Sequence, residues 1–194
     1  MISAMILAAG KSTRMGSPKL LLPWGNSTVL EHIISTLQRA GVEDILVVTG
    51  GARAQVDELA KVHGARTIFN ERYINGEMLE SIQCGLGVQK PEVESTLICL
   101  GDQPQVQERS VRLLCEAYLQ TQSPLVVPSF QMRRGHPWIV ARALWAEVLA
   151  MQSAQTPRDF LNSHTKEIQY VEMDTPSILA DLDTPEEYRT ARPW

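Results

Sequence analysis

Short apolar runs alternate along the chain with segments whose apolar residues recur every three or four positions. The short runs predict buried β-strands, and the segments between them predict amphipathic helices. Such an alternation is typical of a parallel sheet covered by helices on both faces. The pattern therefore predicts an α/β fold: a single Rossmann-like three-layer domain over residues 1–194, with a mostly parallel sheet and a less regular C-terminal portion.

The individual elements follow from the same pattern. Strands are expected at residues 2–8, 44–49, 67–69, 95–100, 125–127, 138–140 and 168–173. Helices are expected at residues 28–40, 54–63, 77–88, 107–122 and 142–151, with a short one after Pro157 and a last one after Thr184. Residues 130–137 are expected to form a loop. Thr28 with Glu31 has the spacing of a capping box, and Thr184 followed by Pro185 has the composition of a helix start.

Composition and charge narrow the class of partner. The chain has 18 basic and 22 acidic side chains, a net charge of −4. Without a basic excess, nucleic-acid binding is not expected as the main task. Hydrophobic residues make up 44% and charged residues 21% of the chain, which excludes disordered and fibrous classes. The distribution of polar and charged residues along the chain favours a monomer.

Neither the cysteines nor the first residues suggest an extracellular protein. The three cysteines, Cys84, Cys99 and Cys115, form no Cys-x-x-Cys pair, so we expect reduced core thiols in a cytoplasmic protein. The apolar residues 1–10 are about half the length of a membrane span and lack a basic start. They are expected to form neither a signal peptide nor a membrane anchor.

The loop after the first predicted strand concentrates small and basic residues. It is expected at the carboxyl edge of the sheet, where open α/β folds bind ligands. Ala8, Ala9 and Gly10 would let a ligand approach the backbone, whose N–H groups can hold phosphates. Positive charge comes from three residues within nine positions: Lys11, Arg14 and Lys19. The loop is therefore predicted to bind phosphate.

The two standard phosphate-binding motifs do not fit this loop. A P-loop has a lysine directly after its second glycine, followed by Ser or Thr, whereas here residues 17–18 separate Gly16 from Lys19. The dinucleotide-binding motif has three glycines in six positions, and only Gly10 and Gly16 are present here.

Carboxylates are expected at the same edge of the sheet. Asp102 follows the predicted strand 95–100, and a strand-end aspartate beside a polyphosphate is a natural Mg²⁺ ligand. The same residue also suits a turn before Pro104. Asp181 and Asp183 would face one side of an extended segment, where a second ligand is possible, although this stretch also has the composition of a helix start.

These motifs together resemble a known family. Residues 7–19 are similar to the L-A-[AG]-G-x-S-x-R-M-G-x-x-K signature of the MobA-like nucleotidyltransferases. The continuation Leu-Leu-Leu-Pro-Trp at residues 20–24 resembles the branch that includes molybdenum cofactor cytidylyltransferases (the MocA type). Residues 101–104 are similar to the family's G-D-[QM]-P, and residues 183–187 to a D-T-P-E-[DE] motif of related nucleotidyltransferases. Residues 76–86 and 135–137 resemble two further family segments.

The resemblance implies roles for individual residues. Nucleotide binding is implied for Leu7, Ala8, Ala9, Gly10, Ser12, Arg14, Lys19 and Ser81. Catalysis is implied for Arg14, Lys19 and Asp102. A Mg²⁺ ion would be held by Asp102 and Asp183, with Asp181 as the alternative to Asp183. Acceptor binding is implied for Arg134 and His136. The chain departs from the pattern at Glu77 and Glu80, where the family more often has Gly and Ser.

The resemblance also implies a reaction: transfer of CMP from CTP to the terminal phosphate of a molybdopterin-type cofactor, with release of pyrophosphate. Ala9 favours CTP over GTP, since guanylyltransferase relatives usually carry Gly at this position. Alternatives that the sequence leaves open are a guanylyltransferase, a sugar- or polyol-phosphate nucleotidyltransferase, and a non-catalytic carrier that delivers molybdenum cofactor to a client molybdoenzyme. An active enzyme could dock to such a client as well.

Overall fold

The computed structural model describes residues 1–10, 15–74 and 77–193. Ser12 and Arg14 of the predicted phosphate loop, together with Lys11 and Thr13, lie outside the described residues.

The strands lie close to their predicted positions. Their bounds are β1 (Ile2–Ala8), β2 (Pro23–Trp24), β3 (Ser27–Thr28), β4 (Asp44–Thr49), β5 (Arg66–Phe69), β6 (Ser95–Leu100), β7 (Leu125–Phe130), β8 (Arg133–Arg134), β9 (Trp138–Ala141) and β10 (Ile168–Glu172). Within the described chain, one eight-stranded sheet has the order β10-β7-β9-β6-β1-β4-β5, with β8 paired to β7. A separate hairpin joins β2 and β3.

The helices agree with the predicted amphipathic segments to within a few residues at their ends. Their bounds are α1 (Val29–Arg39), α2 (Arg53–Val62), α3 (Met78–Leu86), α4 (Glu108–Thr121), α5 (Trp145–Ala150), α6 (Pro157–Ser163) and α7 (Pro185–Ala191). Short 3-10 turns are η2 (Lys19–Leu21), η3 (Arg142–Leu144), η4 (Thr165–Glu167) and η5 (Pro176–Leu179). The predicted capping box is present at Thr28, whose N–H donates to Glu31 Oε2 at 2.6 Å.

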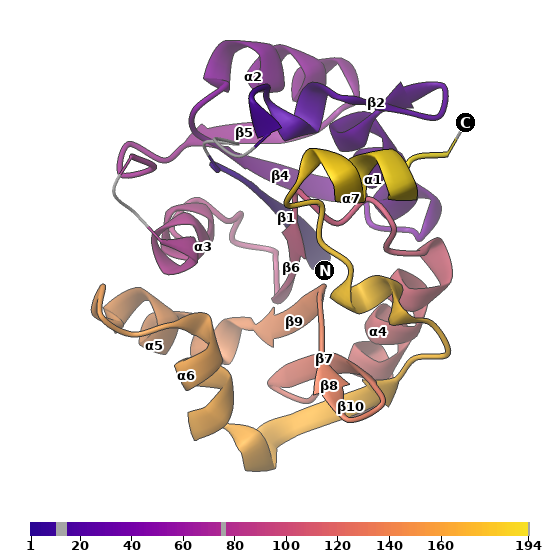
Figure 1. Cartoon of the computed structure of the whole chain (residues 1–194). Coiled ribbons are helices and arrows are strands. Elements are labelled where there is room, and N and C mark those ends of the chain that lie inside the picture. The colour runs from indigo at the N-terminus through magenta and orange to yellow at the C-terminus, as the bar shows by residue number, and fades with distance from the viewer. Residues whose placement is uncertain (11–14, 75–76, 194) are drawn as a thin grey trace.

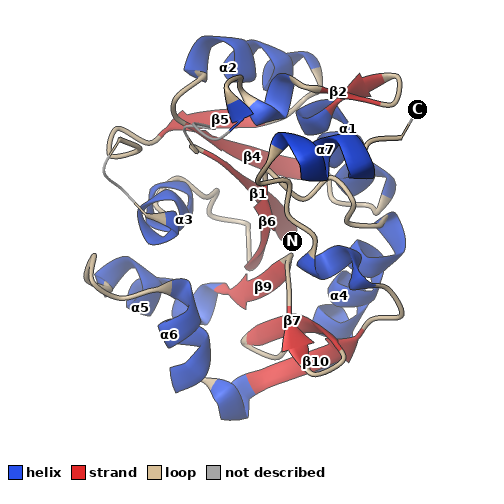
Figure 2. Cartoon of the chain, viewed as in Figure 1, coloured by secondary structure: helices blue, strands red, loops and turns tan. Residues whose placement is uncertain are grey.

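Helices cover both faces of the sheet (Figures 1 and 2), and an apolar core lies on each face. On one face, Ala4, Ile6 and Ala8 of β1 pack in a core that includes residues of α1, α2, α4 and α7. On the other face, Met5 of β1 packs in a second core with residues of α3, α5 and α6. This division follows from the alternation of side chains along a strand. The predicted three-layer α/β fold is confirmed, and none of the described helices has the length and apolar character needed to cross a bilayer.

The direction of β9 decides which loops meet. Strands β1, β4, β5 and β6 are parallel, so their carboxyl ends lie at one edge of the sheet. In contrast, β9 runs antiparallel to β6, with Trp138 opposite Ile98. The residues that precede β9 therefore reach the same edge as Asp102, which follows β6.

Two predictions of local structure were wrong. Residues 130–137, expected as loop, include the end of β7 and all of β8, which pair as a hairpin. In its turn, Gln131 and Met132 adopt the left-handed backbone conformation, with φ 49° and 65°. Hairpin turns of this kind usually contain Asn or Gly, and because neither is present here, the sequence did not predict a hairpin. The helix expected over 142–151 is divided into η3 and α5.

Candidate functional site

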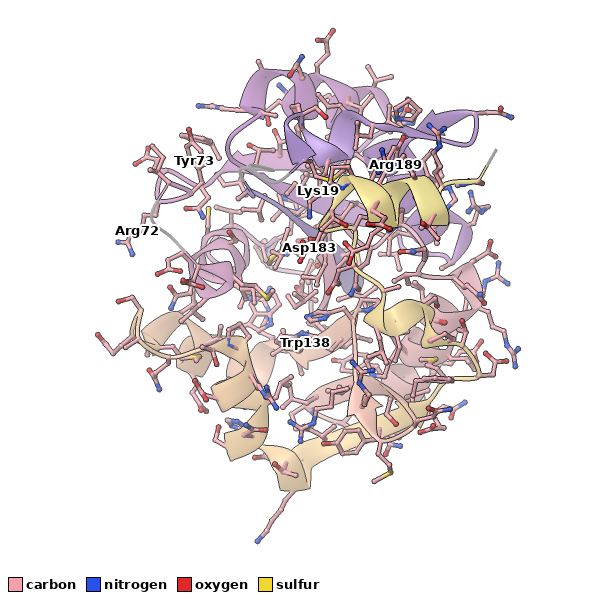
Figure 3. All side chains as sticks on the ribbon, in the orientation of Figure 1. Lys19, Arg72, Tyr73, Trp138, Asp183 and Arg189 are labelled. Atoms are coloured by element: carbon pink, nitrogen blue, oxygen red, sulfur yellow. The ribbon has the colours of Figure 1, made fainter. Side chains whose placement is uncertain are left out.

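An ion-paired cluster lies at the carboxyl edge of the sheet. Lys19 Nζ donates to Asp183 Oδ1 at 2.9 Å and to Asp102 Oδ2 at 3.3 Å. Figure 3 shows Lys19 and Asp183 near the start of α7. The three side chains come from the segment after β1, the end of β6 and the segment before α7. Of the predicted site residues, the structure thus brings Lys19, Asp102 and Asp183 together.

Close backbone packing fixes the position of Asp102. Gly101 donates its N–H to the carbonyl oxygen of Leu7 at 3.1 Å. A Cβ at Gly101 would lie 2.8 Å from that oxygen and 2.9 Å from Leu20 Cδ2, so a larger residue would push the loop away from β1. The Asp102 carboxylate therefore stays beside the end of β1, where the first loop begins.

Burial shapes the charge of Asp102. Desolvation raises the pKa of the Asp102 carboxyl, and Asp181 raises it further, whereas Lys19 lowers it. The net shift is upward. An additional positive charge at this position would stabilise the ionised carboxylate.

The oxygen donors of this cluster fit a divalent cation. Asp102 and Asp183 each place a carboxylate oxygen within 3.3 Å of the same ammonium group. Mg²⁺ typically binds through one or two carboxylates and completes its shell with phosphate oxygens and water. The described residues contain no group of three or more His, Cys, Asp or Glu side chains that could hold a metal. A metal held by these two carboxylates would have coordination positions left for other oxygen ligands.

A short segment, residues 178–183, connects this cluster to the loop before β9; we call it the strap. At one end His136 donates its N–H to the carbonyl oxygen of Ile178 at 3.0 Å. At the other end Leu182 donates its N–H to the carbonyl oxygen of Asp102 at 2.9 Å. The side chains of Ile178 and Leu182 are buried. The strap therefore fixes the backbone that carries Asp183.

Gln103 is a site residue that the sequence analysis missed. Its Nε2 donates to Asp181 Oδ1 at 2.7 Å, and its side chain is buried. Asp181 is thereby held by Gln103, while Asp183 contacts Lys19. The Gly-Asp-Gln-Pro motif could have pointed to Gln103, because a polar amide beside a buried strand end needs a hydrogen-bond partner.

His136 lies at the junction of the strap and the loop before β9. Burial lowers the pKa of its imidazole to about 4, an effect that the nearby Asp181 carboxylate partly opposes. The ring is therefore neutral at pH 7, with one nitrogen able to donate and the other able to accept a hydrogen bond.

A cleft of about 1340 Å³ opens between α6 and the β7–β8–β10 end of the sheet. Residues that line it include Glu77, Arg133, Arg134, His136, Arg158 and Tyr170. The Arg134 guanidinium donates to the Tyr170 hydroxyl oxygen at 2.9 Å and to Asn162 Oδ1 at 2.8 Å. Arg134 and His136, the two predicted acceptor residues, thus line one cleft. Tyr170 and Asn162 carried no signal in the sequence, because only the fold brings them to Arg134.

Ser81 lies in the first turn of α3, buried. Asn70, which follows β5, donates to Ser81 Oγ at 3.1 Å. The two glutamates that depart from the family pattern have structural contacts: Glu80 accepts a hydrogen bond from the Glu77 N–H at 2.7 Å, and Glu77 lines the cleft. The described contacts of Ser81 do not include the Lys19 cluster.

The small residues at the start of the first loop lie at and just after the end of β1. Leu7 is half-buried, Ala8 and Ala9 are buried, and Gly10 is exposed with open space around its Cβ position. Gly50, which follows β4, approaches Ala9 so closely that a Cβ there would lie 2.4 Å from the Ala9 carbonyl oxygen.

All three cysteines are free thiols, as predicted. Burial raises the pKa of Cys84, Cys99 and Cys115, which disfavours their reactive thiolate forms.

The chain is similar to several known proteins. A model of the MobA-like NTP transferase domain matches residues 4–168. The molybdenum cofactor cytidylyltransferase of Escherichia coli K12 is 26% identical over 194 residues, covering 98% of this chain and 95% of that protein. The nicotine blue oxidoreductase of Paenarthrobacter nicotinovorans is 27% identical over 198 residues, covering 96% and 94%.

A further relative is longer. The bifunctional protein GlmU of Syntrophomonas wolfei is 34% identical over 135 residues, which are 68% of this chain and 29% of that protein. Among solved structures, Rv0371c of Mycobacterium tuberculosis H37Rv is similar at a TM-score of 0.84 and 25% identity, covering 97% of this chain and 96% of that one. The manganese complex of Rv0371c is similar at a TM-score of 0.79 and 24% identity, with the same coverage.

The strap generates a prediction at Gly135. A Cβ there would lie 2.3 Å from the carbonyl oxygen of Ile178, so Gly135→Ala must displace the strap. We expect a loss of about 2 kcal/mol or more in the free energy of unfolding, and faster hydrogen exchange of the Leu182 amide. Urea denaturation and amide exchange measured by NMR would check both.

The matched control is Gly87→Ala. A Cβ at Gly87 would make an ordinary contact, 3.4 Å from the Gln83 carbonyl oxygen, in a helical conformation. This variant should stay within about 1 kcal/mol of the wild type. Equal stability and equal Leu182 exchange in the two variants would contradict the tight fit at Gly135.

His136 generates a pH prediction. Its pKa is about 4 in the folded protein, against a usual value of 6.5. Between these values the unfolded chain binds a proton that the folded chain excludes, so stability falls as the pH drops from about 7 towards 4. His136→Gln does not titrate and should lose less stability over this range. Urea denaturation of both proteins at several pH values tests this, and identical slopes would show that His136 titrates normally.

Proposed function

This chain belongs to the MobA-like NTP transferase family and is a nucleotidyltransferase, and from this premise we propose that it transfers CMP from CTP to the terminal phosphate of a molybdopterin-type cofactor. The convergence of Asp102 and Asp183 on Lys19 supports this proposal most directly. Two carboxylates and a lysine from three distant segments suit a metal–triphosphate complex. The nearly full-length similarity to a molybdenum cofactor cytidylyltransferase supports the choice of acceptor.

In the proposed reaction, an oxygen of the acceptor phosphate attacks the α-phosphorus of CTP. A new P–O bond forms there, and the bond from the α-phosphorus to the bridging oxygen of the β-phosphate breaks. Pyrophosphate leaves with the bonding electrons. The acceptor phosphate is already anionic at neutral pH, so no strong base is needed, and catalysis depends on positioning and charge stabilisation.

Lys19 would stabilise the charge that develops on the leaving pyrophosphate. We propose that Asp102 and Asp183 hold a Mg²⁺ ion, which when bound neutralises phosphate charge and orients the triphosphate. Asp183 is the preferred second ligand over Asp181, because Asp183 contacts the same ammonium group as Asp102, whereas Asp181 is bonded to Gln103. Arg14 is proposed as a second cationic group at the phosphates.

The remaining nucleotide contacts are proposed for Leu7, Ala8, Ala9, Gly10, Ser12 and Ser81. The exposed backbone at Gly10 leaves room for a phosphate or ribose. Ala9 adds a methyl group where guanylyltransferases usually have Gly, and this narrows the space for a purine. One methyl group discriminates by about 1–3 kcal/mol, which favours CTP over GTP.

The acceptor would lie in the cleft lined by Arg134 and His136. His136 precedes β9 and is joined to the strap that carries Asp183. The acceptor would present its phosphate to the Lys19 cluster from this cleft. The neutral imidazole of His136 would donate a hydrogen bond to the acceptor.

The test is pyrophosphate release from CTP, GTP, ATP and UTP, each with Mg²⁺ and molybdenum-loaded molybdopterin. We expect release with CTP and a loss of about 10²-fold or more in Asp102→Ala, since the variant lacks a carboxylate for the metal. The control Asp174→Ala removes the same side chain from an exposed ion pair with Arg109 and should keep turnover within about twofold.

Release with GTP instead of CTP would retain the chemistry and overturn the base assignment. Release only with a sugar or polyol phosphate as acceptor would overturn the molybdopterin assignment. Undiminished turnover in Asp102→Ala would overturn the proposed metal site. Binding of molybdopterin without turnover of any nucleotide would favour the carrier function.

A further inference from the structure

Arg134 in the cleft is held by neutral groups. Its Nε donates to the Tyr170 hydroxyl at 2.9 Å, and its Nη1 donates to Asn162 Oδ1 at 2.8 Å. The three residues belong to β8, β10 and α6, so three elements orient one guanidinium. The Tyr170 ring also lies 5.6 Å from the guanidinium carbon.

Several arginines of the protein are neutralised by carboxylates, whereas Arg142 donates to the carbonyl oxygens of Val93 and Lys90. Arg66 pairs with Asp44 at 2.9 Å, Arg39 with Glu108 at 3.1 Å and Arg109 with Asp174 at 2.5 Å. No ion pair joins Arg134 to a carboxylate within the part of the chain that the structure describes. Its partners fix the direction of the guanidinium and leave its positive charge uncompensated.

The Tyr170 hydroxyl has a second hydrogen-bonding capacity. Its oxygen accepts the hydrogen bond from Arg134, which leaves its own proton to be donated elsewhere. The Tyr170 side chain is partly exposed and lines the same cleft. A guanidinium and a phenol that point into one cleft are two donors for a single oxyanion.

The other charges of the cleft leave this site electropositive. Arg133 and Arg158 also line it. Of its two glutamates, Glu172 is engaged in the β7–β8 hairpin: it accepts hydrogen bonds from the Ser129 hydroxyl at 2.5 Å and from the Gln131 N–H at 3.2 Å. The lining therefore has more positive than negative side chains, in a protein whose net charge is −4.

We infer that the Arg134 guanidinium and the Tyr170 hydroxyl form an oxyanion subsite that binds a phosphate monoester of the acceptor, and that Asn162 is the positioning residue of Arg134. The identity of the acceptor rests on the proposed function, whereas the subsite rests on this geometry. Tyr170 is a direct ligand, and Asn162 acts through Arg134.

The decisive variant is Asn162→Asp. A carboxylate at this position would still accept the hydrogen bond of Arg134 but would cancel its charge. If Arg134 only links α6 to the sheet, the variant should match the wild type in both stability and anion affinity. If Arg134 binds an oxyanion, the same stable variant should lose anion affinity.

Phenyl phosphate is the probe, because it is a phosphate monoester on an aromatic ring. Titration of the wild type, followed by calorimetry and by the NMR signal of the arginine Nε–H groups, should show saturable binding that shifts the Arg134 signal. Asn162→Asp should bind at least about tenfold more weakly, with an unchanged melting temperature. Tyr170→Phe should also weaken binding, since it removes one donor.

The matched control is Gln169→Glu. It adds the same charge one residue from Tyr170, on the opposite side of β10, and should keep phenyl phosphate affinity within about twofold. Equal affinity in Asn162→Asp and the wild type, or no binding to the wild type, would overturn the subsite.

The subsite and the proposed function can fail separately. Phenyl phosphate binding that depends on Asn162 supports the subsite even when molybdopterin supports no turnover of CTP, a result that overturns the proposed function alone. Conversely, turnover of CTP with molybdopterin at an unchanged KM for the acceptor in Asn162→Asp would overturn the subsite alone. The subsite predicts a raised acceptor KM and an unchanged KM for CTP.

Discussion

The ion-paired cluster of Lys19, Asp102 and Asp183 is the interaction on which the site depends. The Asp102 and Asp183 carboxylates carry like charges, and the Lys19 ammonium, within 3.3 Å of both, offsets their repulsion. The cluster joins three segments that are far apart in the sequence, so the segment after β1, the end of β6 and the start of α7 must all be in place for it to form. In the proposed reaction, a metal–triphosphate complex would meet carboxylates that are already gathered.

Backbone contacts maintain that arrangement. The strap is hydrogen-bonded to Asp102 at one end and to His136 at the other, and Gly101 and Gly135 allow main chains to approach where a Cβ would collide. The antiparallel direction of β9 brings the loop before it to the same edge as the carboxyl ends of the parallel strands. Because the strap is hydrogen-bonded both to Asp102 and to the loop before β9, the position of Asp183 depends on the loop that borders the cleft.

The positive charges of Lys19 and Arg134 lie in different surroundings. Lys19 is surrounded by carboxylates, which suits a position where a metal and phosphates add further charges of both signs. Arg134 is oriented by a phenol and an amide, which leave its charge available. In the proposed reaction, the first environment would hold the triphosphate and the second would hold the acceptor.

The sequence by itself determined the sheet, the covering helices and the candidate carboxylates, because apolar periodicity, capping residues and strand-end aspartates are local signals. It missed the β7–β8 hairpin, since Gln131 and Met132 are not residues that usually mark a left-handed turn. It also missed Gln103, Asn162 and Tyr170 as site residues. Only the tertiary structure decided that Asp183, rather than Asp181, contacts Lys19, and that Arg134 is held without a carboxylate. These contacts join residues 28 to 164 positions apart, and no local pattern encodes which distant side chains the packing of strands and helices brings into contact.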